Sequence, residues 1–267
     1  MTQLPDDWQI PAHTRNTFGA KAHAYALVIP VINEGERIQN QLRAVAALAL
    51  PLDVIIADGG STDGSLGPDF LKSVAVRACL TKTGDGKLSA QLRMAYAWCL
   101  AEGYEAIITI DGNGKDDVAD LTKMIEKLDD GYDYVQGSRY ARGGRAINTP
   151  KFRWFAGRFI HAPVISLASR HWFTDTTNGF RAYSARYLRD PKVQPFRDIF
   201  MRYNLLFYLS VRAKQLGYKV TEVGVTRSYP DDGKVPTKIT GWSSRFSLLG
   251  ELFAAALGHY HPKRSRN

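Results

Sequence analysis

The sequence predicts an α/β protein in which helices flank a mostly parallel sheet. Short apolar runs alternate along the chain with stretches that have the spacing of amphipathic helices, which is the pattern of strands joined by crossover helices. Each apolar run ends in polar or turn-forming residues. Because ligands of such sheets bind beyond the carboxyl ends of the strands, we expect these polar ends to converge on one ligand site.

The first half of the chain supplies most of this alternation. The predicted strands are short and apolar, and the predicted helices repeat apolar residues every three or four positions. The strands lie at 24–33, 52–65, 104–114 and 132–140, and the helices at 34–48, 88–103 and 118–131. Residues 69–80 are predicted to hold a short helix followed by a strand.

The second half adds a predicted helix at 204–217, a strand at 218–228 and an apolar, amphipathic helix from Arg245 to Tyr260. The last helix has the length of a core helix; alternatively it lies on a bilayer or packs on a partner, and we favour a peripheral surface helix. The expected organisation is an N-terminal arm at 1–23, one large domain at 24–240, and the amphipathic helix with a basic tail at 241–267. No apolar stretch reaches the about 20 residues that a membrane-spanning helix needs.

The composition limits the classes of function. The chain has 267 residues with a formal charge of +9, and 45% of them are hydrophobic, which suits a folded domain with a sizeable core. A basic surface attracts phosphates, so nucleic acid, anionic lipid and phosphorylated substrates are all candidate partners. The two cysteines, Cys79 and Cys99, belong to no CxxC pair or Cys/His cluster. We therefore expect a reducing cytosol and no structural zinc site.

The strand end IITIDGNGKDD, at 107–117, combines a buried strand with metal-binding chemistry. The apolar run leads directly into Asp111, and glycines flank Asn113. Mg²⁺ and Mn²⁺ prefer oxygen ligands and are often shared with substrate phosphates, so Asp111 and Asn113 are candidate metal ligands. The structural alternative is an Asx-turn, in which both side chains satisfy only local backbone groups.

Two other strand ends carry candidate nucleotide contacts. The turn ADGGSTDG, at 57–64, places Asp58 and Asp63 where they could bind a base or ribose; the alternative is helix capping. The segment TGDGKLSA, at 83–90, places Gly86 and Lys87 before a helix, and a helix N-terminus can cradle a phosphate. A short Gly-Lys turn is also common in structures without any phosphate.

Taken in order, these segments resemble glycosyltransferase family 2, and within it the dolichyl-phosphate mannosyltransferase-like branch. The resemblance covers roughly residues 24 to 240. Its motifs are LVIPVINEGERI, VIIADGGSTDGS, TGDGKLSAQLRMAYAWCLAEGYEAIITIDGN, YVQGSRYARGG, DTTNGFRAYSARYL, and a late strand with a Lys-containing loop, GYKVTEVGVTRSYPDDGKVPTK. Chance agreement of all these motifs in the family's order is small.

The resemblance implies a GT-A-type, Rossmann-like fold, a nucleotide-sugar donor and a divalent cation, Mg²⁺ or Mn²⁺. The nucleotide would be held by the two strand-end turns. In this sequence the matching residues are Pro30, Asn33, Glu34 and Asp58. The metal would sit on Asp111 and the donor's diphosphate. The Gly-Ser-Arg segment and the basic residues after it would face the acceptor, which in this family is often a polyprenyl phosphate.

The chain departs from the family pattern at positions that bear on this chemistry. Asn113 replaces the second metal-binding aspartate, and Lys115 replaces a common glutamine. An ammonium cannot ligate a metal, but it could contact the diphosphate and partly replace the ion's charge, which leaves metal dependence open. The Arg-Arg-x-x-Ser acceptor motif keeps only Arg153, with Ala156 at the serine position, so the acceptor could also be another anionic lipid or glycan.

Glycosyl transfer builds negative charge on the departing diphosphate, and a cation or basic side chains can stabilise it. A phosphate acceptor is already ionised and needs little help from a base. A hydroxyl acceptor would need one, and Asp175 is the candidate; the alternatives are an N-cap or a salt bridge to Arg181. Arg139, in the Gly-Ser-Arg segment, is a further candidate catalytic residue.

Residues 139–174 contain no Asp or Glu, and aromatic and aliphatic residues alternate there with seven Arg and Lys residues. A solvated basic face is one explanation. A patch of this kind also suits anions, and the interleaved aromatics indicate contact with the inner surface of a membrane. We therefore expect a cytoplasmic protein that is peripheral on that surface.

Two other classes of function compete with an active transferase. A GT-A domain that binds nucleotide sugar without efficient turnover is suggested by Asn113 and Lys115. A phosphate- or nucleic-acid-binding protein would use the positive charge and aromatic stacking. No nucleic-acid module is recognisable, however, and the acidic strand ends would repel a polyanion, so we expect no nucleic-acid partner.

Overall fold

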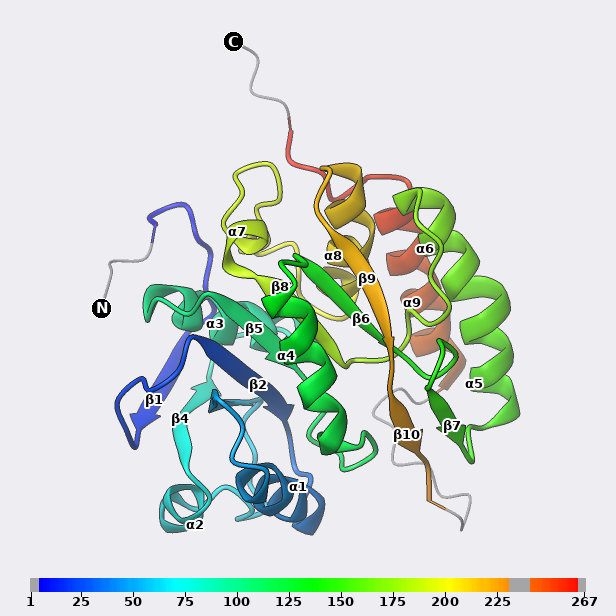
Figure 1. Ribbon diagram of the computed structural model, residues 1–267. Coiled ribbons are helices and arrows are strands. Elements are labelled where there is room, and N and C mark those ends of the chain that lie inside the picture. The colour runs from blue at the N-terminus through cyan, green and yellow to red at the C-terminus, as the bar shows by residue number, and fades with distance from the viewer. Residues whose placement is uncertain (1–4, 231–240, 264–267) are drawn as a thin grey trace.

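The computed structural model describes residues 5–230 and 241–263 of the chain (Figure 1). Within these residues an eight-stranded sheet runs in the order β1-β4-β3-β2-β5-β8-β6-β9. All neighbouring strands pair in parallel except β1 with β4 and β8 with its two neighbours. The predicted mostly parallel α/β sheet is therefore confirmed.

The strands of this sheet begin and end close to the predicted positions in the first half of the chain. Their bounds are β1 His13–Thr17, β2 Tyr25–Val31, β3 Leu52–Asp58, β4 Val76–Lys82, β5 Ala106–Thr109, β6 Tyr134–Ser138, β8 Arg181–Ser184 and β9 Val220–Gly224. A separate parallel pair joins β7 Arg145–Ile147 to β10 Thr226–Ser228. The predicted strand at 218–228 thus divides between two sheets.

Helices cover both faces of the sheet. One face packs against α1 Glu36–Ala47, α2 Pro68–Ser73 and α4 Leu121–Asp129, and the other against α3 Leu88–Ala101, α8 Asn204–Gln215 and α9 Gly241–Ala256. Successive residues of β2 point to opposite faces, so Val28 joins one core cluster and Leu27 and Ile29 the other. Short turns of helix complete the layers at η1 Val118–Asp120 and α7 Ala185–Leu188.

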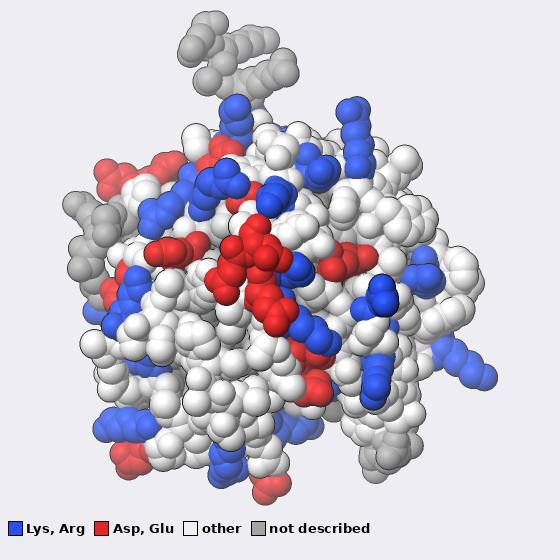
Figure 2. Space-filling view, viewed as in Figure 1, with Lys and Arg blue, Asp and Glu red and all other residues white. Residues whose placement is uncertain are grey.

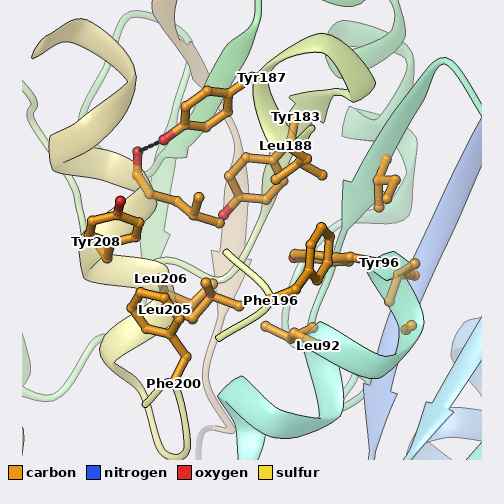
Figure 3. Packing of buried hydrophobic residues seen from close by; sticks show 14 of the residues in the cluster. Leu92, Tyr96, Tyr183, Tyr187, Leu188, Phe196, Phe200, Leu205, Leu206 and Tyr208 are labelled. Atoms are coloured by element: carbon orange, nitrogen blue, oxygen red, sulfur yellow. Dashed lines mark hydrogen bonds between the residues drawn. The ribbon is translucent and has the colours of Figure 1, made fainter. Parts of the chain in front are cut away.

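The core between the sheet and α8 is rich in tyrosine (Figure 3). Tyr134 and Tyr183 stack with their ring centres 5.4 Å apart. The Tyr187 hydroxyl donates to the main-chain oxygen of Leu209 at 2.7 Å, because a buried phenol needs a hydrogen-bond partner. The ring stack joins β6 to β8, and the hydrogen bond joins the turn of helix after β8 to α8. The strand β8 leads out of the segment that meets Asp111.

The predicted N-terminal arm contributes a strand to the sheet. β1 pairs antiparallel with β4 at the sheet edge, and the ring of Trp8 stacks on Phe196 at 3.9 Å. Four of the five residues of β1 are exposed, so the sequence shows no alternation that would have predicted a strand. The boundary at residue 23 stays a prediction.

A continuous helix runs from Lys151 to Ser169 through α5 Lys151–Ala156, the π-helical turn η2 Gly157–His161 and α6 Ala162–Ser169. No helix was predicted for this basic segment. The final helix, predicted within residues 241–260, runs from Gly241 to Ala256. Its Leu252 and Ala255 are buried in the core, whereas Phe253 is exposed.

Parts of the predicted C-terminal segments lie outside the described residues. The Lys-containing loop expected after β10 falls largely at 231–240, outside the described residues, as do 264–267 of the basic tail. Within the described parts of the chain, no helix combines the length and the apolar character needed to cross a membrane.

Candidate active site at the strand ends

Hydrogen bonds join the turns beyond β2 and β3 into one unit. The N–H of Asn33 donates to the hydroxyl of Ser61 at 3.0 Å, and the Asn33 side-chain oxygen accepts from the N–H of Thr62 at 2.8 Å. The N–H of Gly35 donates to the carboxylate of Asp63 at 2.8 Å. Asn33, a predicted nucleotide contact, therefore also fixes the turn after the neighbouring strand.

The other predicted nucleotide-binding acids lie on the same two turns. One carboxylate oxygen of Asp58 accepts from the N–H groups of Gly60 and Ser61 at 3.1 and 2.8 Å, as in an Asx-type turn. Glu34 forms an ion pair of 2.8 Å with Arg37 in the first turn of α1. Each carboxylate thus has a local partner that also holds the turn in shape.

Asp111 lies two residues after the end of β5 and beside the end of β2. The N–H of Gly112 donates to the main-chain oxygen of Pro30 at 3.3 Å, and a Cβ added at Gly112 would lie 2.9 Å from that oxygen. On the other side, Gln41 of α1 donates to the main-chain oxygen of Asp111 at 3.0 Å and accepts from the N–H of Gly114 at 2.9 Å. The structure thus places Pro30 and Asp111 at adjacent strand ends.

The carboxylate of Asp111 occupies space that Gly179 leaves open. A Cβ added at Gly179 would overlap the Oδ1 atom of Asp111. The Asp111 side chain remains 26% exposed, so it lies at the surface rather than in a dry interior. The segment that contains Gly179 joins α6 to β8 along the chain, and it therefore lines one side of the end of β5.

Arg227 of β10 joins two acids of this turn. Its Nη2 atom lies 2.9 Å from Asp111 Oδ2, and its Nη1 atom lies 2.5 Å from Asp116 Oδ2. Burial raises the pKa of Asp116 to about 6, against the opposing attraction of Arg227. Burial alone would lower the pKa of Arg227, but the two carboxylates raise it above its usual value. The guanidinium therefore keeps its charge between them.

Asn113 and Lys115 complete the turn. The Asn113 amide nitrogen lies 3.5 Å from Asp111 Oδ2, and the Asn113 side-chain oxygen accepts from the N–H of Lys115 at 3.3 Å. The buried Lys115 ammonium lies 5.2 Å from the centre of the Tyr229 ring. Burial, and then the nearby Arg227, lower the pKa of Lys115. Because burial disfavours the charged form of this ammonium, an anion bound beside it would stabilise that charge.

The Asp111 carboxylate of this turn fits a divalent cation that is shared with a substrate, because it is partly exposed and Mg²⁺ typically combines one or two protein oxygens with substrate phosphates and water. The Asn113 oxygen instead accepts from the N–H of Lys115, as in an Asx-turn, and the amide nitrogen of Asn113 faces Asp111. Across residues 5–230 and 241–263, no group of three or more His, Cys, Asp or Glu side chains could hold a metal. A cation at Asp111 would therefore take most of its ligands from the donor and from water.

Arg139, at the end of β6, forms a buried ion pair with Asp175. The Nε and Nη2 atoms of Arg139 donate to the two carboxylate oxygens at 2.6 and 2.9 Å, and Thr177 adds a hydroxyl at 3.0 Å. Burial would raise the pKa of Asp175, but the pull of Arg139 outweighs it and the pKa is lowered. Such a carboxylate is a poor proton acceptor. The buried ion pair therefore favours a structural role for Asp175, and its role as a general base stays a prediction.

The alternative of a salt bridge between Asp175 and Arg181 is wrong, because Arg181 points into the core. Its guanidinium is fully buried and donates to the main-chain oxygens of Thr176, Asn178 and Leu206 at 2.8, 3.0 and 2.7 Å. Arg181 therefore ties the segment that carries Asp175 and Gly179 to helix α8.

Tyr229, just after β10, lies among basic side chains. The side-chain charges of Lys115, Arg153 and Arg227 lie 5.2, 5.9 and 5.9 Å from the centre of its ring. Burial would raise the pKa of Tyr229, but Arg227, Arg139 and Arg153 together lower it. The predicted acceptor-side Arg153 and the predicted donor-side Lys115 thus meet at one aromatic ring.

The structure does not match the phosphate cradle predicted at Gly86 and Lys87. The N–H of Lys87 donates to the main-chain oxygen of Met201 and that of Ser89 to Arg202, each at 2.7 Å. Two amides that a phosphate would need at this helix end already have acceptors. The start of α3 is instead hydrogen-bonded to the segment before α8.

Several residues of the site were not predicted from the sequence: Gln41, Asp116, Gly179, Arg227 and Tyr229. Gln41 had a usable signal, because it is a polar residue on the buried side of an apolar helical pattern. Arg227 and Tyr229 lie in the quoted late-strand motif, but no local pattern links them to Asp111, because 116 positions separate Arg227 from Asp111. Only the fold brings β10 to the end of β5.

Comparisons with known proteins show the family of this chain. The model of the family "Glycosyl transferase family 2" matches residues 26–191. Polyprenol monophosphomannose synthase of Mycolicibacterium smegmatis is 27% identical over 75% of this chain and 76% of that protein. Undecaprenyl-phosphate mannosyltransferase of Micrococcus luteus is 27% identical over 74% of this chain and 81% of that protein.

A solved structure shares the fold. Glucosyl-3-phosphoglycerate synthase from Mycobacterium tuberculosis, in complex with Mn²⁺, uridine diphosphate and phosphoglyceric acid, superposes with a TM-score of 0.63 at 15% identity, covering 90% of this chain and 80% of that one. The family model spans more than half of the chain. The chain therefore belongs to glycosyl transferase family 2, in its dolichyl-phosphate mannosyltransferase-like branch, and is a nucleotide-sugar-dependent glycosyltransferase of GT-A fold.

Proposed function

We propose that this glycosyltransferase moves a sugar from a nucleotide-sugar donor to a polyprenyl phosphate at the inner membrane surface. The observation that carries the proposal is the placement of Asp111. Its partly exposed carboxylate lies at the end of β5, beside Pro30 and against the space left by Gly179. The names of two relatives, a polyprenol monophosphomannose synthase and an undecaprenyl-phosphate mannosyltransferase, supply the acceptor class.

The donor would lie across the ends of β2, β3 and β5. Asn33, Glu34 and Asp58 belong to two turns that hydrogen bonds hold together, and in the proposal these turns contact the nucleoside. The diphosphate would lie over Asp111, within reach of Arg227 and Lys115. A divalent cation on Asp111 and Asn113 would neutralise part of the diphosphate charge when bound.

Catalysis in this proposal depends on stabilising the leaving diphosphate. As the glycosidic bond breaks, negative charge grows on the diphosphate, and preorganised cations lower the energy of that state. Arg227 is well prepared for this role because Asp111 and Asp116 hold its guanidinium from two sides. Lys115 supplies a second positive charge from the same turn.

The acceptor side needs no general base if the acceptor is a phosphate, because its oxygen is already ionised at neutral pH. This agrees with the structure of Asp175, whose carboxylate is committed to Arg139. Arg153 lies near Tyr229 on the helix that follows β7. We propose that it orients the acceptor's phosphate toward the sugar.

A transfer assay tests the proposal directly. Purified full-length protein would be incubated with radiolabelled UDP-, GDP- or dTDP-sugars, polyprenyl phosphate in detergent, and Mg²⁺ or Mn²⁺. We expect label in the organic phase with at least one donor, and none with the alcohol form of the lipid. Label transferred equally to the alcohol would overturn the phosphate acceptor.

The second candidate function is binding of a nucleotide sugar without turnover, which Asn113 and Lys115 favour because they weaken the metal site. In that case a donor would bind in the same assay mixture, but neither transfer nor donor hydrolysis would occur with any of the three nucleotides. Transfer with even one of them excludes this alternative.

A further inference from the structure

Tyr203, the residue before α8, lies within reach of both charged sides of the active site. Its ring is half-buried and packs against the core between the sheet and α8. Burial raises the pKa of its phenol; Arg202 and Arg153 lower that pKa, and Glu251 and Asp111 raise it. The hydroxyl is therefore close enough to the turn after β5 and to helix α5 for charges on both to act on it.

The hydroxyl of Tyr203 has no hydrogen-bond partner among residues 5–230 and 241–263. A phenol in a largely buried ring normally has one. On the same helix, the hydroxyl of Tyr208 donates to the main-chain oxygen of Val193 at 2.6 Å. Because its pKa is raised, the Tyr203 phenol keeps its proton at neutral pH. It can therefore donate a hydrogen bond to a bound ligand.

The two sides of the site near Tyr203 carry opposite charge. Residues 139–174 contain no Asp or Glu, and in Figure 2 the right-hand margin of the molecule, where α5 and α6 lie in Figure 1, carries Lys and Arg with no acidic side chain in view. The turn after β5 instead presents the carboxylate of Asp111, which is 26% exposed. A neutral donor between these sides suits a phosphate oxygen, because a carboxylate repels that oxygen and a phenol does not.

Glu251 of α9 holds the main chain at Tyr203. One of its carboxylate oxygens accepts from the N–H of Tyr203 at 3.0 Å, and the other lies 3.7 Å from Nε of Arg202. Arg202 also donates to the hydroxyl of Ser247 on α9 at 2.9 Å. The Glu251 side chain is 13% exposed, so water has little access to this contact. Helix α9 therefore fixes the place from which Tyr203 reaches the site.

Helix α3 holds the same segment from another side. The N–H of Lys87 donates to the main-chain oxygen of Met201 at 2.7 Å. The N–H of Ser89 donates to the main-chain oxygen of Arg202, also at 2.7 Å. The main chain before Tyr203 is thus fixed before any ligand binds. A hydrogen bond from a preorganised group costs little ordering entropy.

We propose that the Tyr203 hydroxyl donates a hydrogen bond to a phosphate oxygen of a substrate bound between Asp111 and Arg153. The inference rests on the proposed function, which brings two kinds of phosphate to this place: that of the acceptor and the diphosphate of the donor. Tyr203 contacts the substrate directly, and Glu251 is a positioning residue that acts through it. The phenol keeps its proton throughout.

Tyr203→Phe tests the contact, because it removes the hydroxyl and keeps the ring that packs on the core. The matched control is Tyr132→Phe, which removes the hydroxyl of another half-buried tyrosine. Tyr132 precedes β6 and therefore lies at the opposite end of the strands from the site. Transfer kinetics of the full-length proteins are measured with a short-chain, water-soluble polyprenyl phosphate. Thermal shifts report the binding of this lipid and of UDP, GDP and dTDP.

We expect Tyr203→Phe to lower kcat/KM at least about tenfold for one of the two substrates, because a hydrogen bond to a charged group is lost. Tyr132→Phe should change kcat/KM less than about twofold. A raised KM for the lipid phosphate with an unchanged nucleotide shift assigns the contact to the acceptor. A smaller nucleotide shift, or a lower kcat, with an unchanged lipid KM assigns it to the donor's diphosphate. Circular dichroism verifies that the variants are folded.

Glu251→Ala tests the positioning role. It should lower the same kinetic parameter as Tyr203→Phe. In the Tyr203→Phe background, however, it should have less than about twofold further effect, because both changes then act on one contact. Independent effects of the two substitutions would limit Glu251 to holding α9 in place and would overturn its positioning role.

Unchanged kinetics and unchanged shifts in Tyr203→Phe would overturn the inference, as would an equal loss in Tyr132→Phe. The proposed function fails separately. Transfer by the wild type and equally by Tyr203→Phe, with equal shifts, removes the inference only. A wild type that transfers no sugar but is stabilised by a nucleoside diphosphate or the lipid phosphate, with that shift reduced in Tyr203→Phe, removes the function only. A wild type that neither transfers nor binds any of these probes removes both.

Discussion

The guanidinium of Arg227 bridges Asp111 and Asp116, at 2.9 and 2.5 Å. Asp116 is completely buried, whereas Asp111 reaches the surface. The bridge therefore links the proposed ligand-facing carboxylate to a buried acid, and it fixes β10 to the turn after β5. Arg227 serves both the stability of the fold and the charge of the site.

Replacing Arg227 by Met should destabilise the protein by about 3–5 kcal/mol, because it leaves the buried Asp116 without its cation. Urea unfolding measures this loss. The control is the double variant Arg227→Met with Asp116→Leu, which removes both charges and should recover most of the stability. A single variant that stays within about 1 kcal/mol of wild type, the size of an average point substitution, would contradict the role of the pair.

Gly179→Ala should displace the carboxylate of Asp111, because the added Cβ would overlap Oδ1. We expect turnover to fall at least about tenfold, with a loss of stability of about 1–3 kcal/mol. The control is Gly250→Ala on α9, where the new Cβ meets nothing within 4 Å. That change should leave activity intact and stabilise slightly. Full activity of Gly179→Ala would show that the position of Asp111 is unimportant.

Asp175→Asn should remove a stabilisation that depends on pH. The pKa of Asp175 in the folded protein lies below its usual value of 3.8, because Arg139 outweighs burial. A lowered carboxyl pKa stabilises the fold above the unfolded-state pKa and loses this effect as the pH falls through the folded-state pKa. Wild type should therefore exceed Asp175→Asn in stability at pH 7, and the difference should shrink below about pH 4.

Urea unfolding of both proteins at several pH values between neutral and acid provides the measurement. Asp63→Asn is a useful comparison, because burial raises the Asp63 pKa but hydrogen bonds, including those from Ser65 and Gly35, outweigh it and lower the pKa without an ion pair. A stability difference at Asp175 that stays constant down to pH 3 would contradict the ion pair as its source.

Arg153→Ala should raise the KM for polyprenyl phosphate at least about tenfold, since a charge-assisted contact to phosphate is lost. The KM for the donor should change less than about twofold, because the donor lies on the other side of Tyr229 in our proposal. Arg142→Ala, an exposed arginine of the same basic segment, is the control. An unchanged acceptor KM in Arg153→Ala would assign the acceptor phosphate to another group.

The sequence predicted the parallel half of the sheet well because each strand there is an apolar run closed by turn residues. β2 and β3 lie within their predicted ranges, and α1 and α3 follow helical spacing. β8 was not predicted as a strand. It has four residues, lies antiparallel between β5 and β6, and follows a segment whose polar residues hide any alternation.

The site was predicted less completely than the fold, for a physical reason. Asp111, Asn33 and Asp58 stand at strand ends, which local sequence can locate. The partners that set their environment come from distant segments: Arg139 pairs with Asp175 across 36 positions and Arg227 with Asp111 across 116. Such pairs depend on the order of strands in the sheet, which no local pattern contains.

The central claim is that the ends of β2, β3 and β5 hold a nucleotide sugar with its diphosphate at Asp111. A thermal-shift screen of UDP-, GDP- and dTDP-sugars, with and without Mn²⁺, on the wild type and Asp111→Ala tests it most directly, because a ligand of the folded state raises the unfolding temperature. We predict that at least one donor stabilises the wild type and that Asp111→Ala loses most of that shift while remaining folded. Equal stabilisation of both proteins by the same donor would contradict the claim.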